Sequence, residues 1–250
     1  MIWHIATREL KSLFLSPIAW AVMAVLQVIL AWVFFVQIDL FLGVQSQLAA
    51  QPNAPGVTDI VVTEVFAWTT ILLLIICPLL TMRLLSEERR SGSLQLLLSS
   101  PVSMTQIALG KFLGVMLFLL ALLAQISLMP LSLYVGTSLD TGILLTSLLG
   151  STLLLAAFSA AGLYISSLTE NPLVAAVSTF GALFMLIIIN IAAGNNGERS
   201  ELFSYLSLLS HHLNMLRGIV DSQDVIYYLL LITTFLTLTI RHLDAQRLQK

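Results

Sequence analysis

The sequence predicts an all-α integral membrane protein with six transmembrane helices and both termini in the cytoplasm. Three observations lead to this prediction: the composition, the number of long apolar stretches, and the distribution of positive charges. Of the 250 residues, 58% are hydrophobic and only 10% are charged, and the mean hydropathy is +0.97. Soluble domains carry roughly 25% charged and about 45–50% apolar residues. A chain this apolar is typical of an integral membrane protein.

Six stretches are apolar enough to cross a bilayer, which takes about 20 residues in a helix. They are expected at residues 18–38, 65–84, 107–135, 143–168, 172–193 and 225–240. Helices are expected rather than a barrel because no stretch alternates apolar and polar residues, and unpaired backbone groups cannot face lipid. The first stretch is longer than the apolar core of a signal peptide, so we expect it to be retained.

The basic residues gather in segments that six spans would place on one side of the membrane. They are Arg8 and Lys11, then Arg83, Arg89, Arg90 and Lys111, and finally Arg241, Arg247 and Lys250. The opposite loops contain Arg199 and Arg217 as their basic residues. Because basic loops tend to stay in the cytoplasm, this distribution predicts that both termini are cytoplasmic.

Residues 1–16 are expected to form an amphipathic helix on the inner membrane surface, an elbow before the first span. Two sets of residues share opposite helical faces: the apolar Ile2, Ala6, Leu10 and Leu13, and the polar His4, Thr7, Arg8 and Lys11. Ser16-Pro17 then turns the chain into the first span. A solvated leader that only satisfies the topology is the alternative.

Residues 194–224 are expected to form an outer helical segment. Asn195-Asn196-Gly197 makes a turn. Leucines then recur on one helical face: Leu202, Leu206, Leu209, Leu213 and Leu216. One or two short helices in the outer leaflet are expected, either as interface anchors or as part of an exit gate.

The loop at residues 85–103 is a charged segment between two apolar spans. Glu87, Glu88, Arg89 and Arg90 form a charged first turn, and Gly92 is expected to interrupt that helix. Ser93 is expected to cap a new short helix, and Pro101 to end it.

The same loop contains an apolar patch formed by Leu94, Leu96, Leu97 and Leu98. Ser103 and Gln106 fit a capping box that opens the third span. Since exposed apolar patches usually mark contact surfaces, we expect a cytoplasmic partner to dock on this loop. An ordinary polar loop is the alternative.

These residues resemble a known pattern. Glu87-Glu88-Arg89-Arg90-Ser91-Gly92-Ser93-Leu94-Gln95-Leu96-Leu97-Leu98, then Ser100-Pro101-Val102-Ser103 and Leu109-Gly110-Lys111, resemble the coupling-helix motif of ABC-2 type transporter permeases. Gln95 stands where that family often has Glu. The resemblance covers residues 1–250 as a single transmembrane domain, and residues 208–228 resemble its gliding-motility and copper-site-maturation branch.

The resemblance implies the permease subunit of an ATP-binding cassette transporter in the bacterial inner membrane, expected to be an exporter. It implies two permease copies, expected to be a homodimer, and two ATPase subunits that bind ATP and Mg; an accessory membrane or periplasmic component is left open. The coupling helix implied to dock the ATPase contains Glu87, Glu88, Arg89, Arg90, Gly92, Ser93, Leu94, Leu97, Leu98 and Pro101. A second cytoplasmic contact is implied at Thr169, Glu170 and Asn171.

The chain itself is not expected to be an enzyme or to hold a cofactor. Gly110-Lys111 lacks the earlier glycine and the following Ser or Thr of a phosphate loop, since Thr105 and Phe112 occupy those places. Any ATP chemistry therefore needs another polypeptide. No basic face suits nucleic acid, and Cys77 has no second cysteine in the chain to pair with.

Two other classes of membrane protein are alternatives. An ion-coupled secondary transporter normally keeps ionisable residues at mid-membrane, whereas the mid-span polar residues here are neutral, such as Gln27 and Gln125. An intramembrane hydrolase would need a serine beside a base within the helices. The adjacent His211 and His212 lie in the outer segment and point to different helix faces, so we expect interfacial residues and no metal site.

Overall fold

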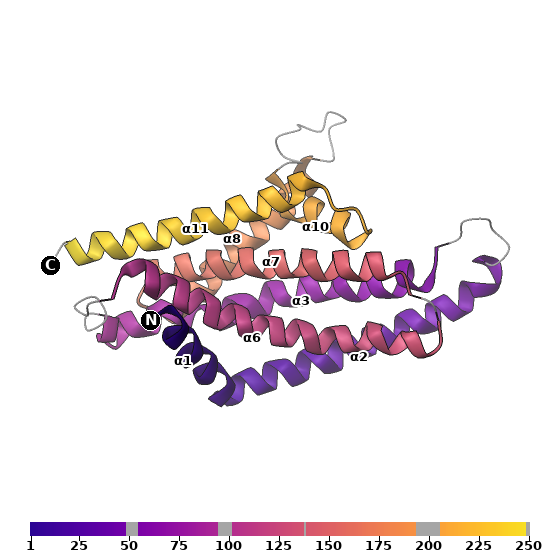
Figure 1. Cartoon of the computed structure of the whole chain (residues 1–250), viewed down its shortest axis with the longest axis horizontal. Coiled ribbons are helices and arrows are strands. Elements are labelled where there is room, and N and C mark those ends of the chain that lie inside the picture. The colour runs from indigo at the N-terminus through magenta and orange to yellow at the C-terminus, as the bar shows by residue number, and fades with distance from the viewer. Residues whose placement is uncertain (49–54, 95–101, 138, 194–205, 249–250) are drawn as a thin grey trace.

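The computed structural model is an elongated bundle of helices (Figure 1). It describes residues 1–48, 55–94, 102–137, 139–193 and 206–248. Within these ranges there is no β-strand, and six segments are long and apolar enough to cross a membrane. The all-α integral membrane class predicted from the sequence is therefore confirmed.

The spanning segments are α2 (Pro17–Leu48), α3 (Thr63–Thr81) continued by α4 (Arg83–Arg90), α6 (Met104–Ser132), α7 (Thr141–Leu168), α8 (Pro172–Ala193) and α11 (Ser222–Leu248). Four of the spanning segments are longer than the stretches predicted from hydropathy, α6 has the predicted length but starts three residues earlier, and α8 has the predicted bounds. A short π-helix, η1 (Thr58–Val62), precedes α3, and a 3-10 turn, η2 (Leu133–Val135), follows α6. The 32 residues of α2 extend about 48 Å at 1.5 Å per residue, beyond the hydrocarbon core of roughly 30 Å. Helical hydrogen bonding continues into the polar residues because no proline follows Pro17 within α2.

α7 is the central helix of the bundle and contacts α3, α6, α8, α10 and α11. Small side chains let its neighbours come close. A Cβ atom added to Gly162 would lie only 2.2 Å from Oγ1 of Thr81, so α3 and α7 touch where residue 162 has no side chain. In contrast, most side chains of α2, α8 and α11 lie on the outside of the bundle.

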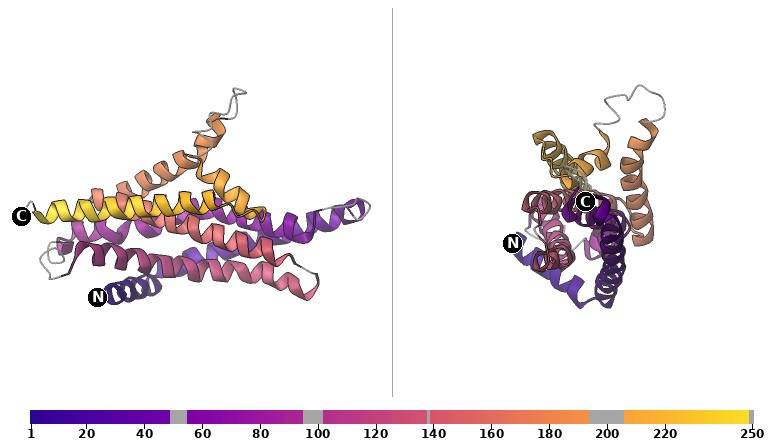
Figure 2. Two further views of the ribbon diagram at one scale, coloured as in Figure 1. Left: turned by 45° about the horizontal axis from the view of Figure 1, so that its top comes forward. Right: turned by 90° about the vertical axis from the view of Figure 1, so that its right-hand side faces the viewer.

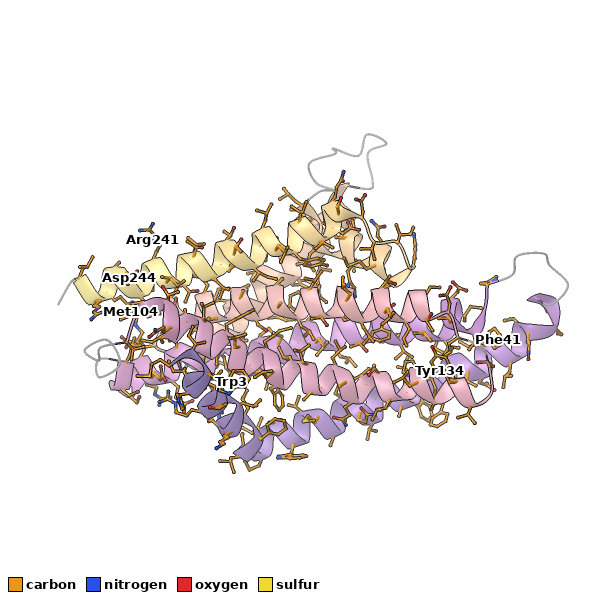
Figure 3. All side chains as sticks on the ribbon, in the orientation of Figure 1. Trp3, Phe41, Met104, Tyr134, Arg241 and Asp244 are labelled. Atoms are coloured by element: carbon orange, nitrogen blue, oxygen red, sulfur yellow. The ribbon has the colours of Figure 1, made fainter. Side chains whose placement is uncertain are left out.

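The two ends of the bundle differ in which parts of the chain they hold. Figure 1 places the start of α1, the end of α4 and the last turns of α11 at one end. Figure 3 shows Met104, Arg241 and Asp244 at that end and Phe41 and Tyr134 at the other. The first end is called the basic end below, because Arg8, Arg83 and Lys111 also lie on its helices.

α1 (Ile2–Leu15) lies on the outside of the bundle at the basic end (Figure 2) and packs mainly on α6. A Cβ on Gly110 would lie 2.7 Å from Cβ of Ile5, and one on Gly114 would lie 2.6 Å from Cβ of Glu9. Two glycines one helical turn apart thus let the α1 backbone approach α6, as small residues do between membrane helices. Ala6 is fully buried between them.

Near the opposite end, α10 (Leu208–Leu216) packs on α3, α7 and α8, and the Leu208 carbonyl oxygen accepts a hydrogen bond from the Tyr228 hydroxyl of α11. Residues 194–205 of the predicted outer segment, with the Asn195-Asn196-Gly197 turn, lie outside the described residues. Our expectation that His211 and His212 are interfacial differs from the structure, since both are buried. Nδ1 of His211 lies 2.5 Å from Asp224 Oδ1, and Nε2 of His212 lies 2.7 Å from Thr70 Oγ1. Polar partners on α11 and α3 therefore satisfy one ring nitrogen of each histidine inside the bundle.

Candidate docking surface

The charged residues predicted to open a separate helix form instead the last turn of α4. Glu87, Glu88, Arg89 and Arg90 continue the helix that begins at Arg83. Gly92 follows in the left-handed region, at φ 73°, where glycine has no steric cost. The segment is therefore the end of the second span rather than the start of a detached element.

These four residues divide into an outward pair and an inward pair. Glu87 and Arg90 are exposed, whereas Glu88 and Arg89 are partly buried. Nη1 of Arg89 donates a hydrogen bond of 2.7 Å to the carbonyl oxygen of Ser167, at the end of α7. The outward pair is available to a partner, and the inward pair fixes the turn to the rest of the chain.

The apolar part of the predicted docking segment is only partly described. Leu94 is 5% exposed and packs into the core of the chain itself, so its side chain does not belong to an exposed patch. The hydroxyl of Ser93 donates to the Glu88 carbonyl oxygen at 3.3 Å, which folds the chain back on α4. Leu97, Leu98 and Pro101 lie outside the described residues.

Ser166 of α7 supports the start of α4. Its Oγ accepts hydrogen bonds of 3.1 Å from the backbone N–H groups of Leu85 and Ser86, and donates one of 2.9 Å to the Met82 carbonyl oxygen. The first N–H groups of a helix have no partner within it, and α4 starts after a break at Met82, four residues beyond Pro78. A serine from α7 thus caps α4 from the side.

The predicted second contact forms a tight turn between α7 and α8. The Thr169 Oγ1 accepts from the N–H of Asn171 at 3.2 Å, and Oδ1 of Asn171 accepts from the N–H of Leu173 at 3.0 Å. Asn171 therefore caps α8, while Glu170 is exposed.

The two predicted contacts meet in space. Asn171 lies with Glu87, Arg90 and Ser91 around one open hollow of about 570 Å³. The remaining lining residues are Met82, Arg83, Pro172 and Leu173. We call Glu87, Arg90, Glu170 and Asn171 the docking surface: segments about 80 residues apart in sequence form one face at the basic end.

On the other side of α4, a buried lysine joins three helices. Nζ of Lys111 lies 2.6 Å from Oε1 of Glu9 and 2.7 Å from Oε1 of Glu88, and its side chain is 1% exposed. Arg8 adds a longer contact of 3.5 Å to the same Glu88 oxygen. We call these four residues the Lys111 cluster; it joins α1, α4 and α6.

The Lys111 cluster was not predicted from the sequence, where Lys111 was one of the basic residues that indicate the membrane topology. A signal was present, because Lys111 shares one helical face with the apolar Met104, Ile107, Val115 and Phe118. A single cation on the buried face of a helix needs a buried counter-charge. The partners themselves come from α1 and α4, and no local pattern predicts them.

Other chemistry is not evident in the described part of the chain. No group of three or more His, Cys, Asp or Glu side chains within it is placed to hold a metal ion. Cys77 is buried, with its Sγ 3.9 Å from Ser159 Oγ.

Comparison with known proteins identifies the family. The family model described as "ABC-2 family transporter protein" matches residues 3–245, from α1 into the last turn of α11. No curated protein matches the sequence. Membership in this family implies pairing with an ABC ATPase subunit. The chain belongs to the ABC-2 family, as a membrane-spanning permease subunit of an ABC transporter.

Proposed function

We propose that this permease binds its ATPase subunit through the docking surface, and that ATP hydrolysis in that subunit drives export of a substrate across the bacterial inner membrane. ATP and Mg²⁺ are bound by the ATPase, since Gly110-Lys111 in this chain lacks the other residues of a phosphate loop. The basic end faces the cytoplasm in this proposal, in agreement with the positive-inside rule.

The observation that carries the proposal is the meeting of two separate segments in one exposed polar face. Glu87 and Arg90 from α4 lie beside Asn171 around a shared hollow. Exposed charges of both signs favour a specific orientation of the partner and speed its association.

The same face is firmly attached to the spans. Arg89 and the Ser166 hydroxyl join α4 to α7, and Lys111 joins α4 to α6. A displacement of the docking surface therefore acts on spanning helices rather than on a loose loop. This is the mechanical property that coupling to an ATPase requires.

We also propose that two copies of the permease assemble with two ATPase subunits. Large apolar side chains along α2 and α8 lie outside the bundle, including Trp20, Trp32, Phe35, Val177 and Met185. Lipid and a second copy are the surroundings that suit such faces. Native mass spectrometry of the purified complex should give a 2+2 composition; a 1+1 complex would contradict this part of the proposal.

The docking proposal is tested by co-expressing the permease with its ABC ATPase subunit. Glu87→Lys and Arg90→Glu should each weaken the complex about ten-fold, a loss of about 1.4 kcal/mol in binding free energy. The matched control is Asp39→Lys, which reverses an exposed carboxylate on α2 far from the basic end. Affinity and stimulated ATP hydrolysis are the measurements; equal values for all three variants and the unchanged protein would refute the docking surface.

ATP dependence is tested separately in proteoliposomes. Transport should require the ATPase subunit and ATP, and an imposed proton gradient should not replace them. Substrate movement driven by the proton gradient in vesicles that contain the permease alone would favour an ion-coupled secondary transporter instead.

A further inference from the structure

Lys111 is the buried cation of the basic end. In the part of the chain that the structure describes, it is the one lysine or arginine whose side chain is buried. Lysine is almost never fully buried unless it is paired. Both of its partners come from other helices, Glu9 from α1 and Glu88 from α4.

The backbone around Lys111 explains how the carboxylates reach it. Gly110 and Gly114 let α1 approach α6, and the close contact at Gly114 is with Cβ of Glu9 itself. Glu88 arrives from the other side, one residue after the exposed Glu87. Lys111 therefore lies between the N-terminal helix and the turn that carries the docking surface.

The charges in this cluster depend on one another. Both carboxylates lie within hydrogen-bonding distance of the same ammonium group. Without it, the exposed Arg8 would be the remaining cation of the cluster, at the longer distances of 3.8 Å to Glu9 and 3.5 Å to Glu88. Oε2 of Glu88 is already buried with no hydrogen-bonding partner among the described residues. Removing one partner from a buried ion pair leaves a buried charge that is poorly compensated, which is strongly destabilising. We expect separation of the two carboxylates to relieve this cost.

We propose that Lys111 is a positioning residue for ATPase coupling: it holds α1 and the last turn of α4 against α6, so that all three move as one unit. This inference rests on the proposed function for its consequence, the coupling to ATP hydrolysis. The positioning itself is a property of the permease alone. The two parts can therefore be tested apart.

The first experiment measures position without the ATPase. Spin labels are attached to cysteines at Lys11 on α1 and Arg90 on α4, both exposed, in a Cys77→Ser background, and their distance distribution is recorded in nanodiscs. Labelled permease is diluted with unlabelled permease, so that the distances recorded lie within one copy, and the unchanged cluster should then give one narrow population. Lys111→Met keeps the length of the apolar stem and removes the ammonium group, and should add a longer and broader population.

A milder variant guards against a failure to fold. Glu9→Gln removes one charge from the rim of the cluster, where the side chain is 15% exposed, and leaves the Lys111–Glu88 pair intact. It should broaden the distribution less than Lys111→Met. The control His4→Gln alters an exposed polar residue of α1 and should change nothing. A narrow, unshifted distribution in both cluster variants would refute the positioning role, whatever binds the docking surface.

The second experiment measures coupling in the assembled complex. A core variant with the same loss of thermal stability as Lys111→Met serves as the reference. Substrate-stimulated or permease-stimulated ATP hydrolysis should be about ten-fold lower with Lys111→Met than with this reference variant. If the labels separate but stimulated hydrolysis is normal, the coupling part of the inference is overturned. If the unchanged permease binds no ATPase at all, the proposed function fails while the distance result still decides the positioning role.

Discussion

Lowering the pH from 7 to 4 should loosen the packing of α10 through His212. This side chain is fully buried, and burial lowers its pKa from 6.5 to about 4. Thr70 donates its hydroxyl hydrogen to the Phe66 carbonyl oxygen at 3.0 Å, so it accepts from the Nε2–H of His212. The neutral imidazole therefore carries its hydrogen on Nε2. Protonation would place a charged Nδ1–H in the interior without an acceptor among the described residues.

The sign and size of the effect follow from the difference between the two pKa values. The unfolded chain binds a proton near pH 6.5 and the folded chain near pH 4, so the unfolded state gains protons first as the pH falls. Stability from the neutral histidine is complete above pH 6.5 and is lost progressively as the pH falls to 4. One pKa unit corresponds to 1.36 kcal/mol, which gives a loss of about 3 kcal/mol over the window.

The assay compares the unchanged protein with His212→Gln, whose amide can still donate to Thr70. NMR titration of histidine ring signals in nanodiscs should place one pKa near 4, and that signal should be missing in the variant. Thermal unfolding between pH 7 and pH 4.5 should show a smaller acid loss in the variant. The neighbouring pair of His211 and Asp224 is present in both proteins, so the comparison isolates the change at residue 212. An imidazole pKa near 6.5 for His212 would refute the reasoning.

Three further predictions concern the joints between helices. Gly162→Leu should destabilise the permease by about 1–3 kcal/mol in thermal unfolding, through overpacking against Thr81. The control Gly43→Leu adds a side chain in open space and should have little effect. Equal losses of stability in the two variants would contradict the close contact. Ser166→Ala removes the acceptor of two α4 amides and should lower the free energy of unfolding by about 1–3 kcal/mol. Amide hydrogen exchange should become faster in α4 and change less in α10. Unchanged exchange in α4 would exclude a capping role. Arg89→Met should lower stimulated ATP hydrolysis with less effect on thermal unfolding, whereas a normal rate would show that its bond to the end of α7 is dispensable.

The number and type of the spans could be predicted from the sequence because lipid imposes a simple rule. Backbone groups in the bilayer must be paired within a helix, so length and hydropathy identify each span. Helix ends were less predictable. Nothing in residues 39–48 breaks a helix, and α2 continues through them although hydropathy falls.

The docking surface could be predicted in part. The family resemblance directed attention to Glu87–Arg90 and to Asn171, and Glu87, Arg90 and Asn171 line one hollow. The sequence does not show which of these side chains point outward and which point inward, because that depends on the rotation of α4 against α6 and α7. A double reversal of Glu87 and Glu88 would therefore mix two effects: Glu87 is exposed, whereas Glu88 is paired with Lys111.

The attachments of α4 on two sides determine how force from a docked partner would spread. On one side Lys111 ties it to α6 and, through Glu9, to α1; on the other, the Ser166 hydroxyl and Arg89 tie it to α7. These bonds involve charged or buried groups, whose separation is costly in a poorly solvated site. α3 in turn packs the side chain of Thr81 directly on Gly162 of α7. A push on the exposed Glu87 and Arg90 would therefore move α1, α3, α6 and α7 together, because moving α4 alone requires breaking the ion pairs of Lys111, the Arg89 hydrogen bond or the buried Ser166 hydrogen bonds first.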